Sequence, residues 1–160
     1  MRNPLDTFAS IKEVKFPLTV PSSIEARIVF YLRYVEAGLA FGDIHPDRYC
    51  RIVYERIVDS PRPVLDELMR FLGERFEEGQ LRFNEFPQQA GLEDPKIAET
   101  RRIHEEAVGR WRSILTHEEA KTIWRETRRV WSLVDPTARF DVDEDPSGWP
   151  LSNRPGLTLT

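Results

Sequence analysis

The chain has 160 residues, of which 40% are hydrophobic and 31% charged, and its formal net charge is -4. This length and composition are typical of one domain with an apolar core. The negative charge argues against general electrostatic affinity for nucleic acid or an anionic membrane, but it is compatible with a local basic pocket. No apolar run approaches the roughly 18 residues needed to span a bilayer. We therefore expect neither a nucleic-acid partner nor a membrane partner.

The first sixteen residues predict a helix whose N-terminus faces an anion. Asn3 is a favoured N-cap, Pro4 suits the first helical position, and Asp6 complements the positive end of the helix dipole. Arg2 precedes this N-terminus and Ser10 follows two turns later, so a guanidinium, free backbone N–H groups and a hydroxyl are predicted to converge on one phosphate-like group. An exposed helix start that binds only water is the alternative, and spacing alone leaves both open.

Apolar residues at helical spacing, with flanking cap residues, predict about five helices. One begins at about residue 4, and the others cover about residues 22–37, 62–72, 96–106 and 116–133. Gly38 and Gly73 are predicted to end the second and third of these helices, and Gly109 to break the helical pattern after the fourth. Thr116 and Glu119 predict a capping box at the start of the last helix, whose predicted apolar face is Ala120, Ile123, Trp124, Val130 and Trp131. The helix over 62–72 has a predicted apolar face made of Val64, Leu65, Leu68, Met69, Phe71 and Leu72.

Residues 49–54, Tyr-Cys-Arg-Ile-Val-Tyr, are rich in strand formers and predict one strand. The succession of helix, strand and helix predicts an α/β fold, although a single strand lacks neighbours for its backbone hydrogen bonds.

The chain is predicted to divide into a domain over residues 1–135 and an irregular tail over residues 136–160. The tail contains three widely spaced prolines after Pro136 and no hydrophobic periodicity, so we expect a surface extension and assign it no function. Residues 75–95 mix charge, Gly and Pro with isolated aromatics, which is typical of a loop packed by a few side chains.

A search for metal and nucleotide motifs finds none. The glycines are scattered, so the sequence contains neither a phosphate loop that ends in Gly-Lys-Ser/Thr nor a dinucleotide fingerprint. His45, His104 and His117 share no metal-ligand spacing with Cys50, so we expect no metal site. Cys50 is the only cysteine and forms no internal disulfide, which fits a cytoplasmic location.

Three stretches carry a family resemblance when they are taken together. They are Arg2–Asp6 with Ser10, then Tyr54–Pro61 leading to Phe71–Gly73, and finally Gly109–Arg112. In this order and approximate spacing, the chain over roughly residues 1–135 resembles the C-terminal part of a sulfotransferase. These enzymes transfer a sulfuryl group from 3′-phosphoadenosine-5′-phosphosulfate (PAPS) to a hydroxyl or amine acceptor. The resemblance implies the helix-rich C-terminal part of an α/β fold related to P-loop kinases, and it leaves the acceptor open.

The resemblance also implies a set of cofactor-binding residues. Arg2 and Ser10 match the residues that bind the 3′-phosphate of PAPS, which agrees with the anion site expected from capping. Tyr54 matches a tyrosine that contacts the adenine, and a packed core aromatic is its alternative. Arg110 and Arg112 lie in the family's third nucleotide-binding region and are expected to close over the phosphate.

Two departures from the family pattern affect the expected activity. Many relatives carry basic residues just before the third region, whereas this chain has His104 followed by Glu105 and Glu106, which repel a phosphate; Arg101 and Arg102 are possible substitutes. In the family, the phosphosulfate-binding loop and the histidine that acts as general base precede the Arg-Asn-Pro segment. We therefore expect the catalytic residues upstream of Met1 and a truncated, inactive form as written.

A non-catalytic module is the alternative function. Such a module would keep the helices and the strand and would dock a partner chain through an exposed helix face or through the unpaired edge of the strand.

Overall fold

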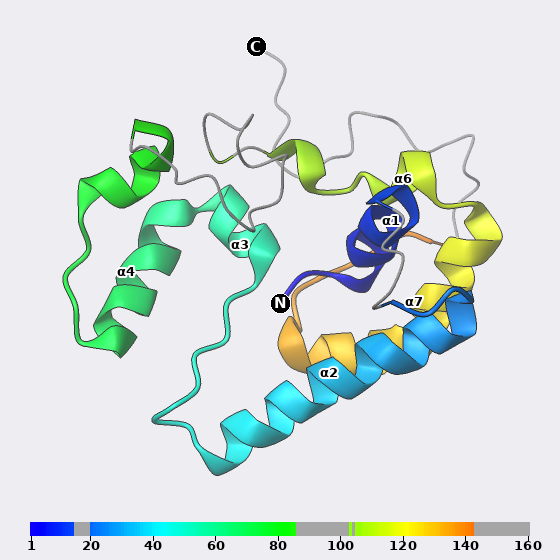
Figure 1. Ribbon diagram of the computed structural model, residues 1–160, viewed down its shortest axis with the longest axis horizontal. Helices are drawn as coiled ribbons and strands as arrows, with labels where there is room; N and C mark the ends of the chain where they lie inside the picture. The colour runs from blue at the N-terminus through cyan, green and yellow to red at the C-terminus, as the bar shows by residue number, and fades with distance from the viewer. Residues whose placement is uncertain (15–19, 86–102, 104, 143–160) are drawn as a thin grey trace.

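The structure is a computed structural model that describes residues 1–14, 20–85, 103 and 105–142, and helices dominate it (Figure 1). The elements are α1 (Pro4–Val14), α2 (Ile24–Ile44), α3 (Tyr54–Asp59), α4 (Pro61–Leu72), the 3-10 helices η1 (Glu78–Glu85) and η2 (Glu105–Ala107), α6 (Trp111–Ile114) and α7 (His117–Val134). These described ranges contain no β-strand. The predicted α/β fold with one strand is therefore wrong, and this part of the chain is α-helical.

The predicted strand at 49–54 is a connection without regular structure, and its last residue, Tyr54, begins α3. The Tyr54 N–H donates to the Met1 carbonyl oxygen at 2.7 Å, and the Met1 nitrogen donates to the Ile52 carbonyl oxygen. These two bonds place Met1 opposite Val53, as in one rung of a parallel ladder. A sheet needs further rungs, and no described segment supplies them, so the strand-forming residues stay without a sheet.

α2 does not end at Gly38 as predicted, because it continues to Ile44. The ring of Tyr49 packs against the two glycines inside the helix. A Cβ on Gly38 would lie 3.0 Å from the Tyr49 Oη, and a Cβ on Gly42 would lie 2.5 Å from the Tyr49 Cδ1. These glycines therefore admit an aromatic ring against the helix backbone, and they are not stop signals.

The apolar core lies among α1, α2, α6 and α7 (Figure 1). All the buried hydrophobic residues of the described ranges except Val58 fall into two adjoining clusters. The first is Leu5, Phe8, Ala9, Ile28, Trp111, Leu115, Ala120, Ile123 and Val142, and the second is Val35, Val53, Trp131 and Val134. Ala120, Ile123 and Trp131 belong to the face that the sequence predicted for α7. The predicted capping box is confirmed, because Thr116 and Glu119 exchange bonds of 3.2 and 2.7 Å at the start of this helix.

α4 begins one residue before the predicted range of 62–72 and ends at Leu72 as predicted, with the C-cap Gly73 at a left-handed φ of 74°. Its apolar face, however, lies outside the core. No residue of α4 is buried, and Phe71 and Leu72 are 39% and 56% exposed. Figure 1 shows α3, α4 and η1 together on one side of the molecule, away from the helices that enclose the core.

Other predictions fall partly or wholly outside the described residues. The helix expected at 96–106 lies almost entirely outside them, and its last two residues belong to η2. The tail is described only as far as Val142, which is 3% exposed and packs in the core. None of the helices in the described part combines the length and the hydropathy needed to cross a membrane.

Glu119 connects α7 to α1 and makes stability dependent on pH. Its carboxylate accepts hydrogen bonds from Lys12 Nζ at 2.7 and 2.9 Å. Burial raises the pKa of Glu119, but the hydrogen bonds from Lys12 and Thr116 outweigh burial and leave this pKa below its ordinary value. A carboxylate with a lowered folded-state pKa contributes stability above about pH 4.3, and this contribution is lost as the pH falls through the lower folded-state pKa.

We therefore expect Glu119→Gln to lower the midpoint of thermal unfolding at pH 7, because the amide keeps an acceptor for Thr116 but loses the charge that attracts Lys12. The difference from the parent chain is expected to shrink as the pH falls below about 4. Calorimetry from pH 3 to pH 7 measures both. A difference between the two chains that is constant across this range would contradict the assignment.

Candidate functional site

The N-terminus of α1 is capped by side chains of the chain itself. Asn3 is 1% exposed, and its Oδ1 accepts from the Asp6 N–H at 2.8 Å, so the predicted N-cap is confirmed. The Asn3 backbone N–H and Nδ2 both donate to Glu55 Oε1, at 3.0 and 2.6 Å. The Glu55 carboxylate therefore occupies the position at the helix start where capping and spacing placed an external anion.

Asp6 connects α1 to residues 109–111 by hydrogen bonds. Its carboxylate is 1% exposed and accepts the Gly109 N–H at 2.8 Å and the Trp111 N–H at 3.0 Å, as well as Asn3 Nδ2 at 2.8 Å. Gly109 has a φ of 77°, a left-handed conformation that favours glycine. This conformation turns the chain so that two backbone donors face one carboxylate.

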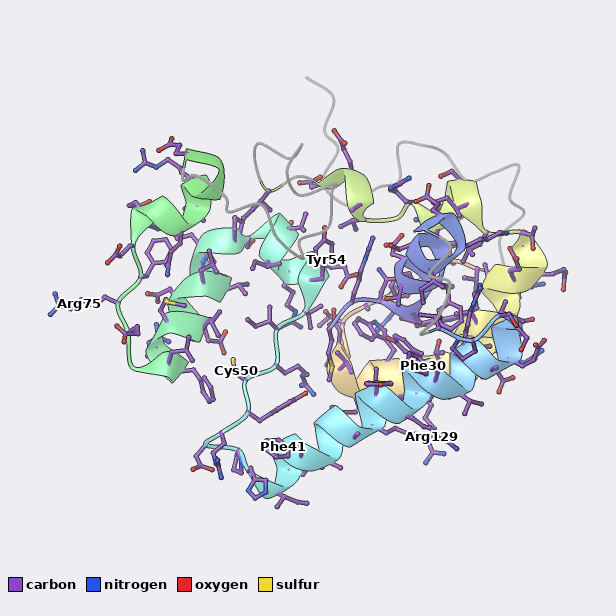
Figure 2. All side chains as sticks on the ribbon, in the orientation of Figure 1. Phe30, Phe41, Cys50, Tyr54, Arg75 and Arg129 are labelled. Atoms are coloured by element: carbon purple, nitrogen blue, oxygen red, sulfur yellow. The ribbon has the colours of Figure 1, made fainter. Side chains whose placement is uncertain are left out.

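Arg2 belongs to the first of the three segments that carry the resemblance, and it contacts the second and lies next to Ala107, which precedes the third. Its guanidinium carbon is 4.9 Å from the centre of the Tyr54 ring, and its Nη2 donates to the Ala107 carbonyl oxygen at 2.5 Å. Its Nε is buried and has no hydrogen-bond partner in the described part of the chain. Figure 2 shows Tyr54 where α3 adjoins the core. The structure thus brings two of the predicted site residues, Arg2 and Tyr54, into contact across 52 positions of sequence.

Tyr31 of α2 and Glu55 of α3 lie beside the N-terminal residues Arg2 and Asn3. The Tyr31 hydroxyl donates to the Arg2 carbonyl oxygen at 3.1 Å. Burial raises the pKa of this hydroxyl, and the negative charge of Glu55 raises it further, so Tyr31 stays a hydrogen-bond donor at neutral pH. Glu55 Oε2 is buried and has no hydrogen-bond partner among the described residues, although Oε1 has two. A buried donor on Arg2 and a buried acceptor on Glu55 are therefore open to a ligand or a water.

The remaining predicted residues lie along α1 or beside it. Ser10 shares a face of α1 with Asp6 and Glu13, because the three residues recur at helical spacing, and it is half-buried. Arg110 Nη2 pairs with Glu13 Oε1 at 2.6 Å, so its charge is partly neutralised. The Arg112 guanidinium carbon lies 4.5 Å from the centre of the Trp111 ring.

The sequence interpretation missed the roles of three groups at this site. Glu55 follows Tyr54 in the family motif and received no role, although its position directly after a site residue was a usable signal. The Ala107 carbonyl carries no side-chain signal. Gly109 was taken as a break in a helical pattern, whereas its N–H and its left-handed φ position a buried carboxylate.

Gly109→Ala is expected to lower the free energy of unfolding by about 1–2 kcal/mol, because a side chain is strained in the left-handed region. The added Cβ would also lie 3.3 Å from Arg112 Nη1. Gly73→Ala is the matched control, since Gly73 has nearly the same φ but open space around its Cβ position. Urea unfolding of both variants measures the costs. A smaller loss for Gly109→Ala than for Gly73→Ala would contradict this account of the segment.

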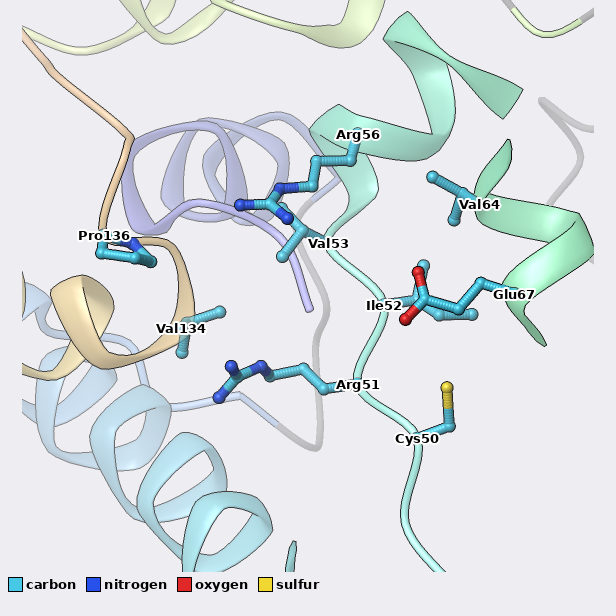
Figure 3. A pocket seen from close by; sticks show the side chains of 9 residues that line it. All are labelled: Cys50, Arg51, Ile52, Val53, Arg56, Val64, Glu67, Val134 and Pro136. Atoms are coloured by element: carbon cyan, nitrogen blue, oxygen red, sulfur yellow. The ribbon is translucent and has the colours of Figure 1, made fainter. Parts of the chain in front are cut away.

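A cavity of about 360 Å³ lies apart from these residues (Figure 3). Its lining residues are Cys50, Arg51, Ile52, Val53, Arg56, Val64, Glu67, Val134 and Pro136, and no predicted site residue is among them. Arg56 Nη2 pairs with Asp135 Oδ1 at 3.1 Å beside it. The described residues contain no group of three or more His, Cys, Asp or Glu side chains that could hold a metal ion.

No family model, curated protein or solved structure matches the chain. The family resemblance therefore rests on the three sequence segments alone.

Proposed function

We propose that this chain binds the adenosine 3′-phosphate end of PAPS and forms that part of a sulfotransferase, which transfers a sulfuryl group to a hydroxyl or amine acceptor. The contact between Arg2 and Tyr54 is the observation that supports the proposal most strongly. These residues come from separate family segments, and the same arginine also bonds to Ala107, just before the third segment. The first and second segments thus meet at Arg2, and Asp6 bonds the first segment to the third.

The chemistry at this point suits a nucleotide with a phosphate. A guanidinium forms charge-assisted hydrogen bonds with phosphate oxygens, and Arg2 has a buried Nε with no partner in the described part of the chain. It lies over one face of the Tyr54 ring, and in the proposal the base stacks on the other face. Arg110 would contribute by exchanging Glu13 for the phosphate, and Ser10 lies on the same face of α1 as Glu13.

The position of Glu55 restricts where the phosphate sits. Its carboxylate already bonds to the first turn of α1, and a phosphate in the same place would meet like-charge repulsion. In the proposal, the phosphate therefore binds to the Arg2 guanidinium and not to the backbone N–H groups of the helix start.

Titration calorimetry with adenosine 3′,5′-bisphosphate tests the proposal. We expect binding to the parent chain, and a loss of about tenfold or more for Arg2→Ala because a charge-assisted hydrogen bond contributes about 1.5–3 kcal/mol. A smaller loss is expected for Ser10→Ala. The control is Arg33→Ala, which removes an exposed arginine of α2 and is expected to bind as the parent does. Absence of binding by the folded parent chain would rule the proposal out.

The chain on its own is expected not to turn over PAPS. Sulfuryl transfer requires a base for the acceptor oxygen and positive charge at the leaving phosphate, and the resemblance assigns both to a region before the Arg2 segment. Incubation with labelled PAPS and a panel of phenol, alcohol and amine acceptors measures this directly. Robust sulfate transfer would show that these 160 residues carry catalytic groups that the proposal does not assign.

The second candidate is a non-catalytic module that docks a partner chain. It is favoured by the outward side of α2, where Val29, Tyr34, Phe41 and Ile44 are 50%, 68%, 45% and 71% exposed. A helix with apolar residues on two sides is suited to lie between two layers. Two results together would favour this candidate. The chain would fail to bind adenosine 3′,5′-bisphosphate, and its association with a partner chain would be lost in the double variant Tyr34→Ser, Ile44→Ser.

A further inference from the structure

The backbone of residues 49–53 is unpaired along most of its length. Within the described part of the chain, none of its five N–H groups donates a hydrogen bond. The Ile52 carbonyl accepts from Met1, and the Val53 carbonyl accepts from the first turn of α3. The Tyr49 ring packs against α2, and α3 begins directly after Val53, so the segment is held at both ends. Its donors are therefore presented at a fixed place.

The segment has the alternation of an extended strand. Val53 has a φ of -91° and a ψ of 123°. Figure 3 shows the side chains of Cys50 and Ile52 directed toward α4, and those of Arg51 and Val53 directed to the other side. Because the N–H and C=O groups of successive extended residues point to opposite edges, Ile52 faces the edge taken by Met1, and Arg51 and Val53 face the opposite edge. On that edge the Val53 carbonyl is bonded to α3, which leaves the Arg51 and Val53 N–H groups and the Arg51 carbonyl for a partner.

Chemical complementarity identifies the class of occupant. A row of alternating N–H and C=O groups matches a second extended backbone, which carries acceptors and donors at the same repeat. The cavity of about 360 Å³ beside the segment offers apolar side chains such as Val64 and Val134 to an incoming strand. Arg51 is exposed and has no ion pair among the described residues, so it attracts a carboxylate on that strand.

We propose that residues 49–53 accept an extended strand of a partner polypeptide at the edge that carries the Arg51 and Val53 N–H groups. The partner strand has alternating apolar residues and an acidic side chain beside Arg51. The main-chain hydrogen bonds supply affinity, and the flanking side chains supply selectivity. This interface does not depend on nucleotide binding, because none of the residues proposed to hold PAPS belongs to residues 49–53.

Selection from a displayed library of random eight-residue peptides tests the proposal. We expect enriched peptides with alternating apolar residues and a central Asp or Glu. Fluorescence anisotropy of the best peptide is expected to show a loss of affinity of about tenfold or more for Arg51→Pro, which removes both one N–H of the open edge and the positive charge. Arg51→Thr keeps this N–H, so we expect a smaller loss that comes from the missing charge. Hydrogen exchange of the Arg51 and Val53 amides is expected to slow when the peptide binds.

Three results would overturn the proposal. The first is a selection in which no peptide is enriched on the parent chain relative to a surface coated with the Arg51→Pro variant. The second is equal affinity of the best peptide for the Arg51→Pro and Arg51→Thr variants. The third is unchanged hydrogen exchange at the Arg51 and Val53 amides in the presence of saturating peptide. Sedimentation that shows a dimer of the parent chain, lost in Arg51→Pro, would identify a second copy as the occupant and would also overturn it. If circular dichroism shows that Arg51→Pro is unfolded, the selection is judged against an uncoated surface and the exchange measurement decides.

Discussion

Asp6→Asn is expected to lower the free energy of unfolding by about 3 kcal/mol, because it leaves a buried backbone N–H without an acceptor. The Asp6 carboxylate is 1% exposed and accepts hydrogen bonds from Asn3, Gly109 and Trp111. An asparagine has one acceptor oxygen, and its amide group is a donor that would face another donor. The loss therefore includes a missing bond and an unpaired group at the junction of α1 with the third family segment.

Urea unfolding at pH 7, followed by circular dichroism, measures this loss. Asp43→Asn is the matched control, since Asp43 is an exposed carboxylate on α2, and its cost is expected to stay within about 0.5 kcal/mol. A cost for Asp6→Asn no larger than that of the control would show that the carboxylate does not hold α1 to residues 109–111.

Trp111→Ala is expected to lower the free energy of unfolding by about 4 kcal/mol, because it removes a large side chain from the centre of the core. Trp111 is 0% exposed and packs in the cluster that contains Leu5, Ile28 and Ile123. Its loss leaves a cavity that the surrounding helices fill only in part. Leu133→Ala is the control, because Leu133 is 63% exposed and its truncation is expected to cost little.

Calorimetric unfolding of Trp111→Ala, of Asp6→Asn and of the variant that carries both substitutions extends the test. The Trp111 backbone N–H, which Trp111→Ala keeps, donates to Asp6, so the tryptophan side chain and the Asp6 carboxylate both hold residue 111 against α1. The loss of unfolding free energy in the double variant is therefore expected to be smaller than the sum of the losses in the two single variants. Full additivity would indicate that the core tryptophan and the buried carboxylate act independently.

Local signals along the sequence predicted the helix starts and ends well. The N-caps at Asn3 and Thr116 and the left-handed C-cap at Gly73 are all observed, because a cap depends on residues within one turn of it. The same signals failed at Gly38, where the glycine makes room for the ring of Tyr49, a residue beyond the end of the helix. No local pattern around Gly38 distinguishes these two uses of glycine.

The fold class was predicted wrongly because a strand is a property of two segments. Residues 49–54 have the composition of a strand, and Val53 has an extended backbone. In the described part of the chain, however, the segment has one rung of pairing, with Met1. Similarly, the spacing of apolar residues predicted the helix α4 correctly. The same spacing does not predict which elements a helix contacts, and α4 packs beside α3 and η1, outside the core.

Capping and spacing predicted an anion site at Arg2 and Ser10, but only the family resemblance connected Tyr54 to it. The resemblance grouped Arg2 and Tyr54, and the structure places them 4.9 Å apart. Spacing along α1 predicted that the backbone N–H groups of the helix start are available to a ligand. It could not show that the carboxylate of Glu55, 52 residues after Asn3, bonds there. Glu55 reaches the start of α1 through a tertiary contact, and the sequence of α1 alone does not predict such a contact.

The affinity of the chain for adenosine 3′,5′-bisphosphate relative to adenosine 5′-monophosphate tests the proposed 3′-phosphate contact most directly. Titration calorimetry measures both values under the same salt conditions. We expect the bisphosphate to bind the parent chain at least about tenfold more tightly, as one charge-assisted contact requires, and we expect this preference to disappear in Arg2→Ala. Equal affinity of the parent chain for the two nucleotides, or a preference that survives in Arg2→Ala, would contradict the account.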